Sequence, residues 1–284
     1  MKKLSIIILS FNTKNILKEC LSSVLKEIDD DKNYELIVID NGSTDGSVEM
    51  IKNYINKSSR QFVKIRDNSG KIILIENKEN LGFSKAVNLG IKKSTGELIL
   101  LLNSDTVIQK DFFKNLLNFE NKVSPSIIGV KFLDPDKDPQ PSVFHLPTVR
   151  RAMEEFWFGK TGSYTKYLPI INDYIEVEAV SGGGMLIPKI IIDKIGLLDE
   201  RYFFYFEDLE YCRRAKKNGY KVYYYSGSQL IHVHGASGTS LAGKEDQWKR
   251  LIPSSKIFHG PLKHYLITFI IWTGQRWKRV FQKE

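Results

Sequence analysis

Residues 98–105 have the sequence Leu98-Ile99-Leu100-Leu101-Leu102-Asn103-Ser104-Asp105. Five consecutive apolar residues after Thr95-Gly96 are too few for a buried helix, so they predict a strand covered on both faces, as in a parallel sheet. Open α/β sheets bind ligands at the carboxyl ends of such strands, which makes Asp105 the first candidate for a metal or substrate ligand. The alternative is that these polar residues only turn the chain and cap the next helix.

Short apolar runs and amphipathic segments alternate on both sides of this stretch. The expected strands are residues 4–10, 35–39, 71–76, 98–102, 127–132, 177–180 and 221–225. The expected helices are residues 14–28, 48–55, 85–92, 111–122 and 190–195, with a later one that is opened by Glu207-Asp208 and ends at Asn218-Gly219. This alternation predicts an α/β fold with a parallel sheet and right-handed crossovers.

The composition fits one large domain, or a domain with a subdomain. The 284 residues are 42% hydrophobic, and a formal charge of +9 suits an anionic partner such as a nucleotide diphosphate or an acidic membrane. A basic surface without such a partner is the alternative. Cys20 and Cys212 have no paired spacing, which argues against a disulfide scaffold or a zinc site and for a reducing compartment. No run approaches the roughly 20 apolar residues that cross a bilayer, so a cytoplasmic protein is expected.

The turn after the first strand disfavours two classes of nucleotide-binding enzyme. Ser10-Phe11-Asn12 stands where a dinucleotide-binding protein would have Gly-x-Gly-x-x-Gly, and the chain has no Gly-x-x-x-x-Gly-Lys-Ser/Thr. Dinucleotide oxidoreductases and P-loop enzymes are therefore disfavoured. No nucleic-acid partner is expected.

Two later segments are candidates for substrate contact. Residues 134–175 are too Pro-rich at their start for regular structure and carry an aromatic stretch, so we expect an acceptor-binding loop there, or else a loop packed by its own aromatic residues. Ser181-Gly182-Gly183-Gly184 runs into apolar residues, which indicates backbone that approaches a ligand closely or adopts positive φ.

Four residues could together support metal-assisted group transfer from a phosphorylated donor. Asp40 and Asp105 follow strands, Asp208 follows an aromatic run, and His232 follows the last clear strand. Carboxylate and imidazole ligands with two diphosphate oxygens would give Mn²⁺ or Mg²⁺ a mixed shell, and the metal would offset charge on a leaving diphosphate. A hydrogen-bonded core histidine is the alternative for His232.

The carboxylate of Asp208 suits a general base. In the first turn of a helix the macrodipole favours the ionised form, so Asp208 is expected to be charged at neutral pH and able to accept a hydroxyl proton. Glu207 is expected to point elsewhere, and His234 lies on the same face as His232 by strand alternation. Simple helix-terminal charge is the alternative for Glu207-Asp208.

Six motifs in order resemble the family 2 glycosyltransferases, in their rhamnosyltransferase-like branch. They are Ser5-Ile-Ile-Ile-Leu-Ser-Phe-Asn12, Val38-Ile-Asp-Asn-Gly-Ser-Thr-Asp45, Asn80-Leu-Gly-Phe-Ser-Lys-Ala-Val-Asn-Leu-Gly90, Leu102-Asn-Ser-Asp105, Ser181-Gly-Gly-Gly-Met185 and Phe203-Phe-Tyr-Phe-Glu-Asp-Leu-Glu-Tyr-Cys-Arg-Arg214. The resemblance spans about residues 4–260. It implies a GT-A fold, which is Rossmann-like with a mixed, mainly parallel sheet flanked by helices, and inverting transfer from a nucleotide-diphosphate sugar.

The resemblance also implies roles for individual residues. Asp208 would be the catalytic base, and Asp105 and His232 would hold Mg²⁺ or Mn²⁺. The expected nucleotide-binding residues are Ser10, Asn12, Asp40, Asn80, Lys85, Asn103 and Ser104. The expected acceptor- or sugar-binding residues are Gly183, Gly184, Glu207 and His234. Two departures stand out: Asn103 replaces an Asp of the family's Asp-x-Asp element, which removes one charge from the metal and ribose site, and Glu210 replaces a frequent Asp.

The expected organisation is a GT-A domain over residues 1–260 and a basic, amphipathic segment over residues 261–284. Residues 1–105 would form the nucleotide-binding half and residues 106–260 the acceptor-binding half. In the last segment Leu266, Ile270, Trp277 and Phe281 can share a helical face beside basic residues, which suits the inner face of an anionic plasma membrane and a lipid-linked acceptor. A helix docked on the protein or on the partner in a homodimer is the alternative.

The leading hypothesis is thus a glycosyltransferase in cell-surface polysaccharide or glycan synthesis. A GT-A-like protein that binds a sugar nucleotide or glycan without turnover is the rival, and Asn103 favours it. A sugar-phosphate nucleotidyltransferase is the second rival, but Ser10-Phe11-Asn12 does not supply the Gly-rich basic loop that it needs.

Overall fold

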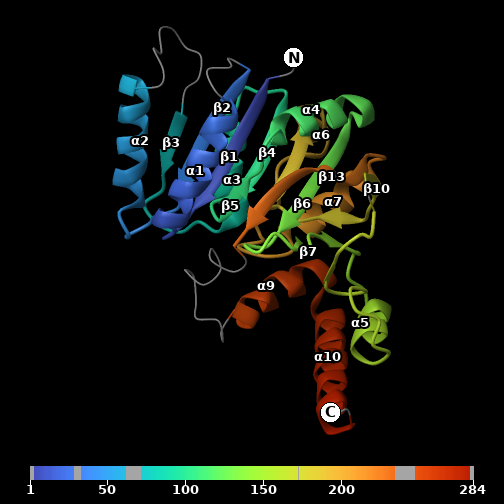
Figure 1. Ribbon diagram of the computed structural model, residues 1–284. Coiled ribbons are helices and arrows are strands. Elements are labelled where there is room, and N and C mark those ends of the chain that lie inside the picture. Colours follow the sequence, from blue (N-terminus) through green and yellow to red (C-terminus); the bar gives the residue numbers. More distant parts are fainter. Residues whose placement is uncertain (1–2, 29–32, 62–71, 172, 234–246, 282–284) are drawn as a thin grey trace.

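The computed structural model describes residues 3–28, 33–61, 72–171, 173–233 and 247–281. A central sheet runs through the molecule with its strands in the order β10-β13-β6-β12-β4-β1-β2-β3 (Figure 1). The strands are β1 (Leu4–Ser10), β2 (Tyr34–Asp40), β3 (Ile72–Glu76), β4 (Leu98–Asn103), β6 (Ser126–Leu133), β10 (Tyr174–Glu176), β12 (Gly184–Pro188) and β13 (Lys221–His232). β1, β2, β3 and β4 pair in parallel, as do β6 and β13, whereas β12 runs antiparallel between β4 and β6.

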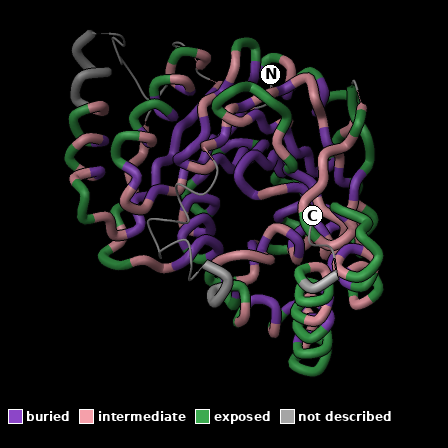
Figure 2. Tube along the Cα trace, turned by 60° about the horizontal axis from the view of Figure 1, so that its bottom comes forward, coloured by how far each residue is buried: buried purple, intermediate pink, exposed green. Residues whose placement is uncertain are grey.

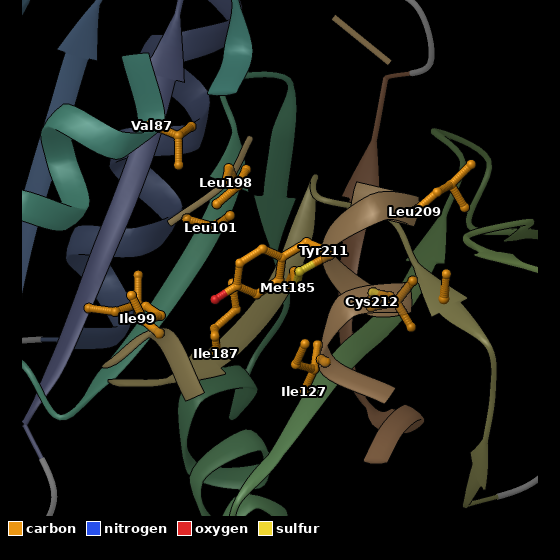
Figure 3. Packing of buried hydrophobic residues seen from close by; sticks show 14 of the residues in the cluster. Val87, Ile99, Leu101, Ile127, Met185, Ile187, Leu198, Leu209, Tyr211 and Cys212 are labelled. Carbon is orange, nitrogen blue, oxygen red and sulfur yellow. The ribbon is translucent and has the colours of Figure 1, made fainter. Parts of the chain in front are cut away.

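Helices cover both faces of this sheet because its strands are apolar on both sides. The helices of the sheet domain are α1 (Lys14–Ile28), α2 (Ser47–Gln61), α3 (Phe83–Lys93), α4 (Phe112–Val123), α6 (Lys189–Ile195) and α7 (Glu207–Lys217). Leu100 packs with residues of α1 and α4 on one face, while its neighbour Leu101 packs with residues of α3 and α7 on the other. The buried residues form the middle of the molecule, and Figure 3 shows part of the second core around Leu101 and Tyr211 (Figures 2 and 3). The predicted α/β fold with a mixed, mainly parallel sheet is confirmed.

Two of the strands that were not predicted, β5 and β12, shape the site. The glycine-rich stretch continues as β12, so Gly184 begins a buried strand. β5 (Thr106–Ile108) follows Asp105 directly and pairs with the far end of β13, where His232 lies opposite Thr106. The chain therefore turns at Asn103-Ser104-Asp105 into a strand, and the helix begins only at Phe112.

Residues 134–175 hold more regular structure than their prolines predict. They contain β7 (Pro139–Gln140), β8 (Val143–Phe144), α5 (Val149–Phe156) and β9 (Lys166–Tyr167), and β8 joins β9 and β11 (Ala179–Val180) in a second sheet. Pro139 fits because β7 pairs with β6 through only two residues at the end of that strand. Pro147 directly precedes Thr148, whose side chain caps α5 by accepting a hydrogen bond from the Arg151 N–H. The expectation of an irregular loop was wrong for these parts.

The C-terminal helices extend away from the sheet. α9 (Gln247–His259) leads into α10 (Pro261–Phe281), which packs along α5 beyond the body of the domain (Figure 1). Ile267 and Ile270 of α10 are buried against Ala152 of α5. No helix in the described ranges is long and apolar enough to cross a membrane.

Candidate active site

A cavity of about 350 Å³ lies at the carboxyl end of β4. Its walls include Asp105, Glu207, Asp208 and His232, which come from three separate parts of the chain. Asp105 and Asp208 thus line one cavity, as the sequence predicts. Topology explains the convergence, because the β5–β13 pairing brings His232 next to Asp105 and α7 begins beside β12.

Asp105 and His232 form the polar end of this cavity. Both are buried, and His232 Nε2 lies 3.6 Å from Asp105 Oδ1. On the other side of the ring, Nδ1 lies 2.7 Å from Gln140 Oε1. Because the amide oxygen can only accept, Nδ1 carries the proton in the neutral ring, and Nε2 then presents its lone pair on the side of Asp105.

This pair fits one side of a divalent-metal site. A lone-pair nitrogen and a carboxylate oxygen are ligands for Mn²⁺, and their 3.6 Å separation leaves room for both to contact one ion. The described residues contain no group of three or more His, Cys, Asp or Glu side chains that could hold a metal. Asp105 and His232 could therefore hold the ion only with further ligands, such as phosphate oxygens of the donor.

Asp208 lies in the first turn of α7, at the opposite wall. Its Oδ1 accepts a hydrogen bond from the Leu209 N–H at 2.8 Å and its Oδ2 one from the Gly182 N–H at 3.2 Å. Burial nevertheless raises the pKa of Asp208, against the opposing effect of Lys166 and these N–H groups. The direction is opposite to that expected from the helix terminus alone, and it makes the carboxylate more basic.

Glu207 lines the same cavity rather than pointing elsewhere. Burial and the neighbouring charge of Asp208 hold the pKa of Glu207 well above its usual range. Its Oε2 is buried and has no hydrogen-bond partner among the described residues. Of the two carboxyl groups, Glu207 is therefore the one whose charged form the site disfavours more strongly.

A strained bend presents these two residues to the cavity. Tyr205 and Phe206 both have positive φ, at 70° and 69°, a conformation that costs non-glycine residues of order 1–3 kcal/mol each. α9 holds the bend in place: the Phe258 ring centroid lies 5.3 Å from that of Phe206, and the Ser254 hydroxyl donates to the Phe204 carbonyl at 2.8 Å. The turn that aims Asp208 thus depends on a helix more than 40 residues further along the chain.

Lys166 is a cavity residue that the sequence analysis missed. It lies on β9, is half-buried, and its Nζ is 5.3 Å from the centroid of the Phe144 ring. Burial lowers the pKa of Lys166, while the charges of Asp208, Asp105 and Glu207 oppose that shift. The amine thus faces three acidic groups, whose charges favour its protonated form. No motif surrounds it in the sequence, and only the β8–β9 pairing brings it into the site.

A smaller pocket adjoins the main cavity and shares Phe83, Asn103 and Phe204 with it. Asn80 and Ser104 also line this pocket, as expected for nucleotide-binding residues. Asn80 Oδ1 accepts hydrogen bonds from the Asn41 side-chain amide and the Gly82 N–H, both at 2.9 Å. The pocket is therefore braced by side-chain amides.

Hydrogen bonds of the turn between β1 and α1 support this pocket. The Ser10 and Thr13 hydroxyl oxygens are 3.0 Å apart, and the Thr13 hydroxyl donates to Ser104 Oγ at 2.9 Å. Asn12 Oδ1 accepts a hydrogen bond from the Thr44 N–H at 2.8 Å. Ser10 and Asn12 thus hold neighbouring loops together at the edge where the pocket lies.

Besides Ser10 and Asn12, three of the expected site residues, Asp40, Lys85 and Gly184, line neither cavity. Asp40 is buried under the turn that it caps through the Ser43 N–H, at 2.9 Å, and Lys85 is exposed on α3. Gly184 packs into the core, where a Cβ would lie 2.8 Å from side-chain atoms of Val130. His234 is outside the described residues. The predicted roles of these residues, like those of all the other expected site residues, stay predictions.

Gly183 allows β12 to approach the site closely. A Cβ on Gly183 would lie 2.8 Å from Asn103 Nδ2, and the Gly183 carbonyl accepts a hydrogen bond from the Asn103 N–H at 3.2 Å. Gly182, Gly183 and Gly184 have ordinary φ, so of the two expectations for this stretch, close approach holds and positive φ does not. The approach is to neighbouring side chains of the site.

Comparison with known proteins agrees with this geometry. The model of glycosyl transferase family 2 matches residues 5–177. The hexosyltransferase Agl10 of low-salt glycan biosynthesis in Haloferax volcanii is 26% identical over 263 residues, which cover 90% of this chain and 76% of the relative. The dTDP-rhamnosyl transferase RfbF of Shigella flexneri is 23% identical over 198 residues, 69% of this chain and 60% of the relative.

Solved structures share the fold at low sequence identity. The structure of GalNAc-T7 with UDP, GalNAc and Mn²⁺ has a TM-score of 0.61 at 16% identity, and it matches 89% of this chain. Staphylococcus aureus TarS has a TM-score of 0.56 at 17% identity, over 98% of this chain. The chain spans about half of those two proteins, 48% and 44% of their lengths.

The fold and the family model therefore agree on the class of protein. The architecture is that of the GT-A glycosyltransferases. The chain belongs to glycosyl transferase family 2, as its six motifs indicate.

Proposed function

We propose that this chain is an inverting glycosyltransferase that moves a hexosyl or rhamnosyl group from a nucleotide-diphosphate sugar to an acceptor hydroxyl. The observation that carries the proposal is the shared cavity of Asp208, Asp105 and His232, with the smaller pocket beside it. One relative named above is a hexosyltransferase of glycan biosynthesis and another is a dTDP-rhamnosyl transferase, which supports a glycan or lipid-linked acceptor in cell-surface polysaccharide or glycan synthesis.

In this proposal the reaction is a single displacement. The acceptor oxygen forms a bond to the anomeric carbon while the bond from that carbon to the diphosphate oxygen breaks, so the anomeric configuration inverts. Asp208 takes the hydroxyl proton of the acceptor, which its raised pKa favours. In this proposal Glu207, whose pKa burial and the charge of Asp208 raise well above its usual range, holds the proton of the pair and leaves Asp208 as the base.

The opposite end of the cavity would bind the leaving group. A divalent metal held by Asp105 and His232 would neutralise negative charge on the nucleotide diphosphate. Lys166 would add a second positive charge from β9, and Asn103 would bind the donor without the charge of an aspartate. Asn80 and Ser104 would contact the nucleoside part of the donor in the smaller pocket.

The proposed location is the cytoplasmic face of the plasma membrane. Cys20 and Cys212 are buried free thiols, in line with a reducing compartment. The C-terminal helices would bring the domain to a membrane that holds a lipid-linked acceptor.

A panel of nucleotide sugars tests the proposal. The purified chain is incubated with UDP-, GDP- and dTDP-sugars and Mn²⁺, Mg²⁺ or a chelator, and release of nucleoside diphosphate is measured. We expect one class of donor to be turned over only with metal. NMR of the glycosylated product then gives the anomeric configuration. No turnover of any donor, or a product with retained configuration, would contradict the proposal.

A further inference from the structure

α10 carries a row of large apolar side chains that are about half exposed or more. Leu262, Tyr265, Leu266, Phe269 and Trp272 are 87%, 59%, 48%, 61% and 55% exposed. Their spacing of three and four residues places them on one side of the helix, which we call the α10 apolar face. Apolar patches of this size on a surface mark interaction sites.

The opposite side of α10 is already used by the fold. Ile267 and Ile270 are buried against α5, and the Trp157 indole N–H donates to the Ile270 carbonyl at 3.2 Å. At Gly274 a Cβ would lie 2.7 Å from the Phe156 carbonyl oxygen, so the two helices are in close contact. Ile270 is therefore not on the exposed face, contrary to the grouping that the sequence suggests. The helix is fixed on the domain, and the α10 apolar face points outward.

Positive charges border this face. Lys256 Nζ lies 5.0 Å from the Tyr265 ring centroid, and the Arg276 guanidinium lies 5.4 Å from that of Trp272. The helix carries four Lys or Arg residues and no Asp or Glu. Aromatic rings with flanking cations match the boundary between lipid headgroups and acyl chains, where a helix lies parallel to an anionic membrane surface.

We propose that the α10 apolar face docks on an anionic lipid bilayer, with Phe269 and Trp272 inserted at the headgroup boundary and Lys263 and Arg276 at the phosphates. The helix is fixed to the domain along α5 and is not long and apolar enough to cross the membrane, so the mode is surface docking. A second copy of the chain is the competing occupant, but its own row of cations would repel this one.

α9 connects this face to the catalytic cavity. Leu251 lines the cavity, and the Ser254 bond to the Phe204 carbonyl ties α9 to the bend before Asp208. If the proposed function holds, docking places the cavity one helix away from the lipid surface, and the acceptor is a membrane-held one. That last step rests on the proposed function, whereas docking itself does not.

Vesicle flotation of the full chain tests the docking. We expect binding to phosphatidylcholine vesicles that contain phosphatidylglycerol, weaker binding without it, and a decrease at high salt. The double variant Phe269→Asp with Trp272→Asp should lose at least about tenfold in affinity. Ile190→Asp, the same change at a 59% exposed residue of α6, is the matched control and should bind like the wild type.

Two outcomes would overturn the docking proposal. One is that the wild type does not bind vesicles, or that the wild type and the double variant bind them equally well. The other is a dimer in light scattering that the double variant splits into monomers, since the face would then belong to a second copy. Donor hydrolysis in solution is measured on the same samples. If the wild type binds vesicles but does not hydrolyse any donor, the proposed function is contradicted and the docking proposal still holds.

Discussion

Replacement of Asp208 by Asn separates catalysis from binding at this site. Asn has nearly the same size but cannot take a proton from an acceptor hydroxyl. General base catalysis contributes about 10²–10⁴ to a rate, so we expect kcat for transfer to fall by that factor, which is about 3–5 kcal/mol of the barrier. Donor binding should stay within about threefold, because the metal and nucleotide side of the cavity is built from other residues.

The cost of this change to folding is small by comparison. Asp208 accepts two backbone N–H bonds, and the amide oxygen of Asn can keep the 2.8 Å bond from Leu209 while losing the one from Gly182. One lost hydrogen bond costs about 1 kcal/mol. Removal of the charge next to Glu207 offsets part of this, since that charge is one of the causes that raise the Glu207 pKa. A loss of activity of 10²-fold or more is therefore not explained by unfolding.

Two variants on the same helix complete the assay. Glu210→Gln removes a carboxylate that pairs with Arg214 at 2.9 Å and lies outside the cavity lining, so its kcat should match the wild type. Glu207→Gln mimics the protonated acid and should keep most of the activity. Turnover is followed as nucleoside diphosphate release, donor affinity by calorimetry and folding by thermal unfolding. The reasoning is refuted if Asp208→Asn keeps more than about a tenth of the activity, or if Glu207→Gln loses as much as Asp208→Asn.

Three further variants test the Lys166 cation in the cavity, the glycine that precedes α3 and the ion pair between Glu178 and Arg151. Lys166→Met should weaken the binding of UDP, GDP or dTDP about tenfold, because a hydrogen bond to a charged group contributes roughly 1.5–3 kcal/mol at most. Lys166→Arg should restore part of the affinity, which is measured by calorimetry. Equal affinities of the wild type and Lys166→Met would exclude the contact with phosphate. Gly82→Ala should lower the free energy of unfolding by about 2 kcal/mol or more. The φ of Gly82 is +79°, and a Cβ there would lie 2.5 Å from the Phe203 carbonyl oxygen. A urea denaturation curve identical to that of the wild type would contradict this prediction. Glu178→Gln should lower the free energy of unfolding by about 1 kcal/mol at pH 7, after allowance for solvent screening, and by less as the pH falls from about 4.5 towards 2. The reason is that burial, which raises the pKa of Glu178, is outweighed by the Arg151 bonds and charge together with the Leu146 N–H, so that the pKa falls from 4.5 to about 2. A difference in stability that stays constant over that range would rule out the ion pair as its cause.

The order of the first strands and helices could be predicted because it depends on local patterns. Val38 and Leu100 belong to apolar runs that require cover on both faces, and the motifs around Asp40 and Asp105 mark where those runs end. β5 and β12 could not be found in this way. β5 has three residues and β12 begins at the last of three consecutive glycines, and both are strands because β13 and β4 provide partners from distant parts of the chain.

The candidate site was predictable in its acids and not in its cation. Asp105 and Asp208 stand at the ends of recognisable elements, so their position in a shared cavity follows from α/β topology. Lys166 follows no such element, and the prolines that precede it in the sequence indicated a loop without regular structure. The raised pKa of Asp208 could not be predicted for a related reason: the helix terminus, which favours the ionised form, is visible in the sequence, whereas the burial that outweighs it comes from packing.

The position of the base depends on the C-terminal helices as much as on the sheet. Two consecutive residues with positive φ, Tyr205 and Phe206, persist only where packing outweighs their strain. That packing comes from Phe258 and Ser254 on α9, which continues into the helix with the α10 apolar face. If docking on a surface displaced α10, the displacement would therefore reach the turn before Asp208 through the contacts of α9. The same arrangement explains why a binding surface outside the sheet domain can affect chemistry at the end of β4.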